Sequence, residues 1–87
     1  MNDNFEREKI MLSLSSNEAL VLFEWLSTKL DYIRDNQVFD DIAEYSALLG
    51  IEGQLQKILA EPFLENYKEL LELARRAVVP DPEDWNI

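Results

Sequence analysis

The chain contains neither cysteine nor histidine in its 87 residues, and it has only two glycines and three prolines. Without cysteine it forms no disulfide and offers no thiolate nucleophile, which is consistent with a reducing compartment. Without histidine it cannot build the Glu-x-x-His ligand pairs of helical di-iron sites, nor supply the usual general base for a serine nucleophile. Two glycines are too few for a phosphate-binding loop. These absences predict a protein that is not an enzyme and that has no catalytic residues, cofactor or metal.

Basic residues and long apolar runs are also scarce. Eight Lys and Arg stand against eighteen Asp and Glu, which gives a formal net charge of -10. Such a charge repels nucleic acid and anionic lipid and attracts cationic proteins, although solubility alone explains it equally well. No apolar run approaches the roughly 18 residues of a membrane-spanning helix, and residues 1–7 are polar and acidic where a signal peptide would be basic. We therefore expect a cytoplasmic protein that contacts neither nucleic acid nor membrane directly.

The remaining composition predicts a single folded domain over residues 1–87. Hydrophobic residues make up 47% and aromatic residues 10%, too much for a disordered acidic segment. We expect an ordered core at about residues 10–79, followed by an acidic tail at residues 80–87. Near the start, Ile10, Leu12 and Leu14 alternate with other residues. This spacing predicts an extended arm that either lies along the core or pairs with another chain.

Two helices are predicted before residue 62. Ser15 and Glu18 form a Ser-x-x-Glu capping box, so the first helix should begin there and end near Asp35. Trp25 lies on the wide apolar face of this helix and is expected to be in the core. The residues that define this face recur at spacings of three and four: Ala19, Leu22, Phe23, Leu26, Leu30 and Ile33. The inward face of the second helix is predicted to be Ile42, Tyr45, Leu48, Leu49, Leu55, Ile58 and Leu59. Gly50 and Gly53 interrupt this run, and we expect the helix to continue through them and to present a smooth patch for a neighbouring helix.

Pro62 should close the second helix, because proline restricts the residue before it and lacks an amide donor. Asn66 and Glu69 then predict a second capping box and a third helix, which Pro80 stops. Three capped helices with short connections indicate an all-α fold. We expect a small three-helix or four-helix bundle with an extended N-terminal arm and an acidic C-terminal tail.

The candidate partner-binding residues are carboxylates in three groups and one tryptophan. They are Asp40, Asp41 and Glu44 at the start of the second helix, Glu61, Glu65, Glu69 and Glu72 as an acidic stripe along the third helix, and Asp81, Glu83, Asp84 and Trp85 in the tail. Carboxylates can also hold metals, but here a charged helix start or a solvated helix face explains them better. Trp85 either folds back onto the bundle or anchors a partner.

Residues 14–26 (LSSNEALVLFEWL) and 61–71 (EPFLENYKELL) together resemble a group of small, acidic, helical bacterial proteins. The resemblance covers about residues 12–78, and members of the group are similar to immunity proteins of contact-dependent inhibition systems. The chain departs from them at Gly50 and Gly53 and in its acidic tail. The resemblance implies an immunity protein that neutralises a basic toxin, expected to be a nuclease. It carries over no catalytic residues.

Two other functions fit the same sequence. One is a self-associating structural or regulatory module that forms a homodimer through the first helix or through residues 50–53. The other is an acidic nucleic-acid mimic that binds a DNA-binding regulator. A homodimer that buries Trp25 would favour the first alternative, and a monomer with an exposed acidic face would favour an inhibitor.

Overall fold

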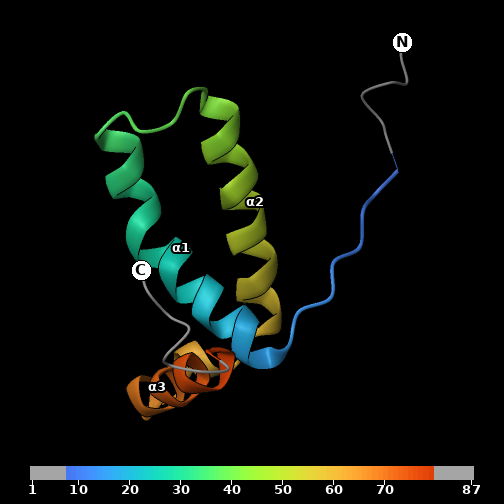
Figure 1. The fold of residues 1–87 in the computed structure, drawn as a ribbon, viewed down its shortest axis with the longest axis vertical. Coiled ribbons are helices and arrows are strands. Elements are labelled where there is room, and N and C mark those ends of the chain that lie inside the picture. Colours follow the sequence, from blue (N-terminus) through green and yellow to red (C-terminus); the bar gives the residue numbers. More distant parts are fainter. Residues whose placement is uncertain (1–7, 80–87) are drawn as a thin grey trace.

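The computed structural model describes residues 8–79 as an all-α bundle, as the sequence predicted. The helices of this part are α1 (Ser16–Asp35), α2 (Ile42–Ile58), the single-turn 3-10 helix η2 (Glu61–Phe63) and α3 (Tyr67–Val78). Helices α1 and α2 form an antiparallel pair, and α3 crosses the end of the pair where α1 begins and α2 ends (Figure 1). The tail residues predicted to bind a partner, Asp81, Glu83, Asp84 and Trp85, lie outside the described residues.

Helix α1 begins where the sequence predicted. The Glu18 backbone N–H donates to Ser15 Oγ at 3.0 Å, and the Ser15 N–H donates to Glu18 Oε1 at 2.8 Å, so both halves of the capping box are formed. Each bond satisfies a backbone amide that the helix cannot pair. The helix ends at Asp35, also as predicted.

The core lies along α1, because both other helices pack on it and few contacts join α2 to α3. Its buried residues are Leu20, Phe23, Leu26 and Leu30 from α1, Leu55 from α2 and Leu59 directly after it, and Leu71 and Ala74 from α3. No polar or charged side chain is buried in the described part of the chain. Ser27 Oγ donates to Glu52 Oε2 at 3.0 Å and adds one polar link between α1 and α2. The bundle therefore depends on a small apolar core with α1 at its centre.

Two expectations about burial were wrong. Trp25 is 44% exposed, because it is one residue, about 100° around the helix, from the core residue Leu26. On α2, Ile42, Leu49 and Ile58 are exposed, although all three were assigned to the inward face. Helix α2 is covered mainly by α1, and one neighbour cannot bury so wide an apolar face. The unexpected result is a surface rich in apolar side chains.

Helix α2 continues through Gly50 and Gly53, as predicted. No element of the described chain approaches either glycine, since a Cβ atom at each position would meet nothing within 4 Å. Within residues 8–79 the smooth patch is thus open, and none of the described helices uses it.

The second predicted capping box is absent. Asn66 is the N-cap of α3, but its side chain makes no capping hydrogen bond. Its backbone lies at φ -94° and ψ 30°, away from the extended geometry that normally directs an N-cap side chain to the helix amides. The α3 helix is held instead by its strongly amphipathic pattern, which places Leu71 and Ala74 in the core.

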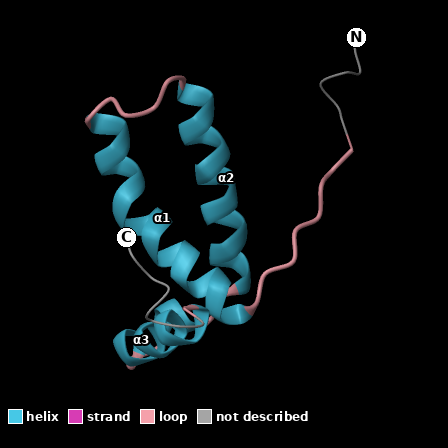
Figure 2. Cartoon of the chain, viewed as in Figure 1, coloured by secondary structure: helices cyan, strands magenta, loops and turns pink. Residues whose placement is uncertain are grey.

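The arm preceding α1 extends away from the bundle (Figure 2). Residues 8–15 have no helix or strand, and all of them are exposed. Of the two alternatives predicted for the arm, packing along the core is therefore not what the chain does.

Candidate protein-binding surface

Residues 31–44, here called the acidic turn, concentrate negative charge at one end of the molecule. They cover the last turn of α1, the connector and the start of α2, at the end of the pair opposite α3 (Figure 1). Five carboxylates and a single cation, Arg34, fall within these fourteen residues: Asp31, Asp35, Asp40, Asp41 and Glu44. A group of like charges at a protruding end produces a local negative potential that attracts cationic surfaces.

The connector is fixed by backbone hydrogen bonds rather than by glycine. The Val38 N–H donates to the Ile33 carbonyl at 3.2 Å and the Gln37 N–H to the Arg34 carbonyl at 3.1 Å, which is a Schellman motif. Gln37 takes the left-handed position of this motif, with φ 58°. A residue with a Cβ atom in this conformation costs about 1 kcal/mol relative to glycine. The acidic turn is therefore a defined structure that holds some backbone strain.

Two of the predicted carboxylates orient the start of α2. Asp41 is the N-cap and accepts a hydrogen bond from the Ala43 N–H at 2.8 Å. Glu44 Oε1 accepts one from the Asp40 N–H at 3.0 Å. Both carboxylates lie near the positive end of the helix dipole, where negative charge stabilises the helix. No hydrogen bond or ion pair within residues 8–79 engages the Asp40 carboxylate.

Arg34 and Tyr45 tie the two helices together beside the turn. Arg34 Nη1 donates to the Tyr45 hydroxyl at 2.9 Å, and its Nε donates to Asp35 Oδ1 at 3.1 Å. The Tyr45 hydroxyl in turn donates to Asp31 Oδ1 at 2.9 Å. The hydrogen bond to Asp31 raises the pKa of Tyr45, and the one to Asp35 raises the pKa of Arg34, so both groups keep their protons at neutral pH. Arg34 is thereby engaged with the α1 carboxylates, and Asp40, Asp41 and Glu44 have no cation beside them in the turn.

Apolar side chains are exposed among these charges. Tyr32 is 66% exposed, and Val38 and Ile42 are each 64% exposed. Trp25 lies seven residues before Tyr32, so the two rings occupy one face of α1 about 10 Å apart along its axis. Large aromatic side chains surrounded by polar groups are typical of residues that anchor protein interfaces. The acidic turn and the outer face of α1 together form our candidate protein-binding surface.

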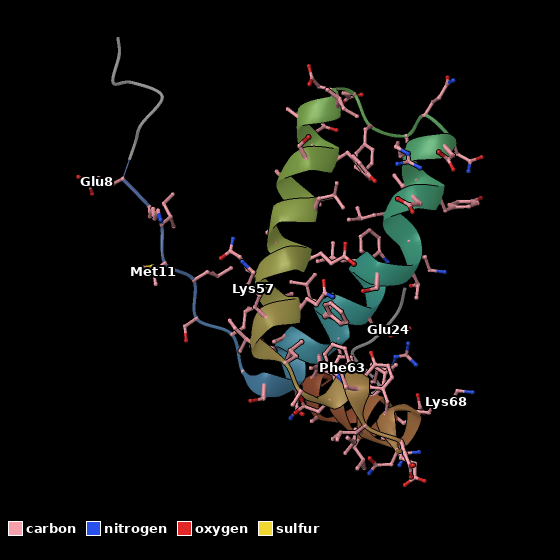
Figure 3. The ribbon with its side chains drawn as sticks, turned by 180° about the vertical axis from the view of Figure 1, so that it is seen from behind. Glu8, Met11, Glu24, Lys57, Phe63 and Lys68 are labelled. Carbon is pink, nitrogen blue, oxygen red and sulfur yellow. The ribbon has the colours of Figure 1, made fainter. Side chains whose placement is uncertain are left out.

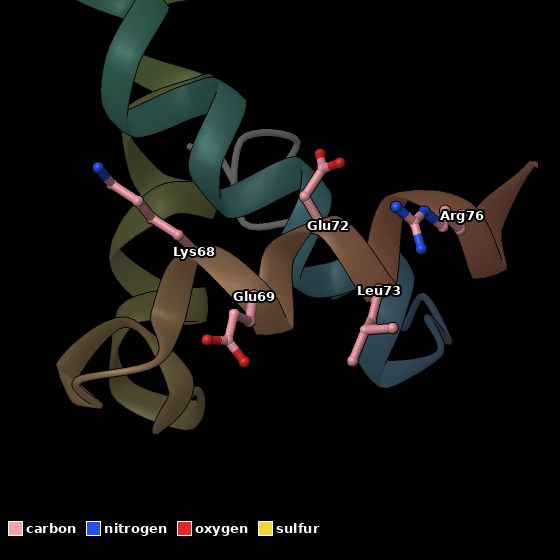
Figure 4. Close-up of a pocket in the computed structure, with 5 residues that line it drawn as sticks. All are labelled: Lys68, Glu69, Glu72, Leu73 and Arg76. Atoms are coloured by element: carbon pink, nitrogen blue, oxygen red, sulfur yellow. The ribbon is translucent and has the colours of Figure 1, made fainter.

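The second predicted group of carboxylates does not form an acidic stripe. Glu61 lies in η2 and Glu65 in the turn that follows, so only Glu69 and Glu72 are on α3. They share that helix with three cations, and Glu72 forms an exposed ion pair with Arg75 at 3.3 Å. Figure 4 shows a shallow depression on α3, lined by Lys68, Glu69, Glu72, Leu73 and Arg76. Its mixed charge gives no clear preference for a cationic partner.

The described residues offer little for other kinds of site. No three side chains of the types that ligate metals gather in residues 8–79. None of the described helices combines the length and the apolar character needed to cross a membrane. Comparison with family models, curated proteins and solved structures gave no match to this chain.

Sequence reasoning missed part of the surface. Asp31, Asp35, Tyr32 and Val38 belong to the acidic turn but were not among the predicted partner-binding residues. A charge count across residues 31–44 would have found Asp31 and Asp35, because a short connection brings the end of one helix next to the start of the next.

Proposed function

We propose that this protein is a cytoplasmic immunity protein that binds and neutralises a basic toxin, expected to be a nuclease, through the candidate protein-binding surface. The observation that carries the proposal is the acidic turn, where five carboxylates lie beside exposed Tyr32, Val38 and Ile42. An enzyme that acts on nucleic acid needs a cationic surface for the phosphates, and the acidic turn is complementary to such a surface.

Charge and apolar groups have separate roles in this proposal. The carboxylates speed association by attracting the cationic partner over distances comparable to the Debye length, about 8–10 Å. Tyr32 and Trp25 provide the contact area that slows dissociation. The cap and Schellman hydrogen bonds hold the carboxylates in place before binding, which lowers the entropic cost of ordering them.

The test compares two variants with equal charge and different placement. The turn variant carries Asp35→Asn, Asp40→Asn, Asp41→Asn and Glu44→Gln, and it keeps the helix start because asparagine caps as well as aspartate. The control variant carries Glu61→Gln, Glu65→Gln, Glu69→Gln and Glu72→Gln. The probe is the protein that co-purifies with the tagged wild-type chain from its native host, and its association rate is measured at about 50 and about 300 mM salt.

We expect a strongly basic protein that is toxic when expressed alone. The turn variant should associate about tenfold more slowly at low salt, with a weaker salt dependence, and should protect cells less well. The control variant should behave like the wild type. Equal association rates for both variants would show that the acidic turn is not the recognition surface, and a neutral or acidic partner would contradict the proposal itself.

A further inference from the structure

The arm at residues 9–14 presents apolar side chains that no part of the described chain covers. Ile10, Met11 and Leu12 are 92%, 89% and 79% exposed. Met11 stands well away from α2, on which Lys57 is labelled (Figure 3). Within residues 8–79, no backbone N–H or C=O group of residues 9–14 has a hydrogen-bond partner. An extended segment with unpaired backbone and apolar side chains is a template for pairing with another strand.

The charge pattern favours a second copy of this chain as that strand. Residues 9–17 are the longest stretch of the sequence without an acidic residue, and Lys9 is their only charged group. Elsewhere the net charge of -10 opposes self-association, and a cationic partner has little reason to choose this stretch. The arm is thus the part of the molecule where two copies can meet with little repulsion.

We propose that two copies pair through their arms as an antiparallel ribbon centred on Leu12. Antiparallel strands about a two-fold axis are self-complementary, so one register sets Leu12 opposite its own copy and Ile10 opposite Leu14 of the second copy. All six of these side chains then lie on one face of the ribbon, because side chains alternate along a strand. Met11 and Ser13 lie on the other face.

The exposed side of α2 supplies the rest of the interface. Two strands alone are marginally stable, and a lasting interface buries about 800 Å² per partner. Ile51 and Ile58 are two helical turns apart on α2 and are 39% and 77% exposed in the single chain. They offer the apolar surface that the ribbon needs. The arm joins the start of α1, and the acidic turn lies at the other end of α1, about 30 Å away. The dimer therefore leaves both acidic turns accessible.

The absence of cysteine makes this register directly testable. A single Leu12→Cys substitution would place two thiols on directly opposed residues, whose Cα atoms are about 4.5–5.5 Å apart, within the range of a disulfide. Met11→Cys is the matched control, because its copy lies diagonally across the ribbon at about 7–8 Å. Under mild oxidation we expect Leu12→Cys to form covalent dimer at least about tenfold faster than Met11→Cys.

A second pair of variants tests the apolar face without oxidation. In sedimentation equilibrium the wild type should form a dimer at micromolar concentration. Leu12→Asp should be a monomer, because it brings two negative charges together at the axis, and Ser13→Asp should remain a dimer. Both should keep the wild-type helical circular dichroism, since the arm lies outside the core.

Several results would overturn the inference. These are a wild type that stays monomeric, equal cross-linking of the two cysteine variants, or a dimer that Leu12→Asp does not affect. Hydrogen-exchange protection of the arm that arises only when the basic partner is added would assign the arm to that partner. The turn variant described above should still dimerise, so a failure of this inference and a failure of the proposed function are distinguishable.

Discussion

The hydrogen bond between Tyr67 and Glu24 provides a quantitative test of how α3 is held. The Tyr67 hydroxyl donates to Glu24 Oε1 at 2.5 Å, and this is the only side-chain hydrogen bond from α3 to α1 within residues 8–79. A hydrogen bond to a charged group contributes about 1.5–3 kcal/mol, and partial exposure of this pair places it near the lower end of that range. We expect Tyr67→Phe to lower the free energy of unfolding by about 1.5 kcal/mol.

This loss is large for a domain of this size, whose total stability is on the order of 4–13 kcal/mol. It corresponds to a fall in Tm of about 6–12 °C, measurable by circular dichroism. Tyr32→Phe is the matched control, because no described group hydrogen-bonds the Tyr32 hydroxyl, and it should change stability by less than about 0.5 kcal/mol. A double-mutant cycle with Glu24→Ala should give a coupling energy of about 1 kcal/mol. Coupling near zero, or equal losses in the two tyrosine variants, would show that this hydrogen bond does not hold α3 on α1.

The same pair predicts a dependence on alkaline pH. Burial, with the adjacent Glu24 carboxylate, raises the pKa of Tyr67 above its ordinary value of 10. Because the folded state favours the protonated phenol, the stabilisation is complete below pH 10 and is lost as pH rises above it. The difference in stability between the wild type and Tyr67→Phe should therefore be constant at neutral pH and shrink above pH 10. Urea titrations at several pH values would measure it.

Two further predictions concern the backbone, and urea unfolding measures both. Gly50→Ala and Gly53→Ala should each stabilise the free protein by about 0.5–1 kcal/mol, because both positions are helical and a Cβ atom there meets open space. A loss of stability would show that something the described chain lacks already packs against α2. Gln37→Gly should stabilise by about 0.5 kcal/mol, since the relief of left-handed strain exceeds the added freedom of the unfolded chain. Destabilisation would mean that the Gln37 side chain stabilises the folded state by more than the left-handed strain costs.

The sequence was sufficient to predict the helices, because their signals are local. The Ser15 to Glu18 capping box and the spacing of Leu26 and Leu30 depend on residues within one or two turns. The end of α1 at Asp35 and the continuation of α2 through Gly50 followed from the same kind of pattern. The failure at Asn66 is local too, because the backbone geometry there, and not the residue type, decides whether a cap forms.

Burial was harder to predict, because it depends on how many neighbours each helix has. The apolar residues of α2 fit a helix packed on two sides, yet α1 is its main neighbour and Ile58 remains exposed. The candidate site was likewise predicted only in part. Asp40, Asp41 and Glu44 were identified from sequence, but the turn that joins them to Asp31 and Asp35 became visible only from the fold.

On helix α3 the sequence predicted an acidic surface that the fold does not form. Four glutamates at regular spacing suggested a continuous acidic stripe, although a stripe requires that one helix carry all of them. The break at η2 separates Glu61 and Glu65 from Glu69, and the cations of α3 balance those that remain.

We propose that the acidic turn and the outer face of α1 recognise a basic protein. The most direct test is an NMR titration of the labelled full chain with the basic protein recovered from the native host. We expect the largest backbone shifts to fall in residues 31–44, with a shift of the Trp25 indole N–H. Shifts confined to α3 and residues 61–66, with residues 31–44 unchanged, would contradict it.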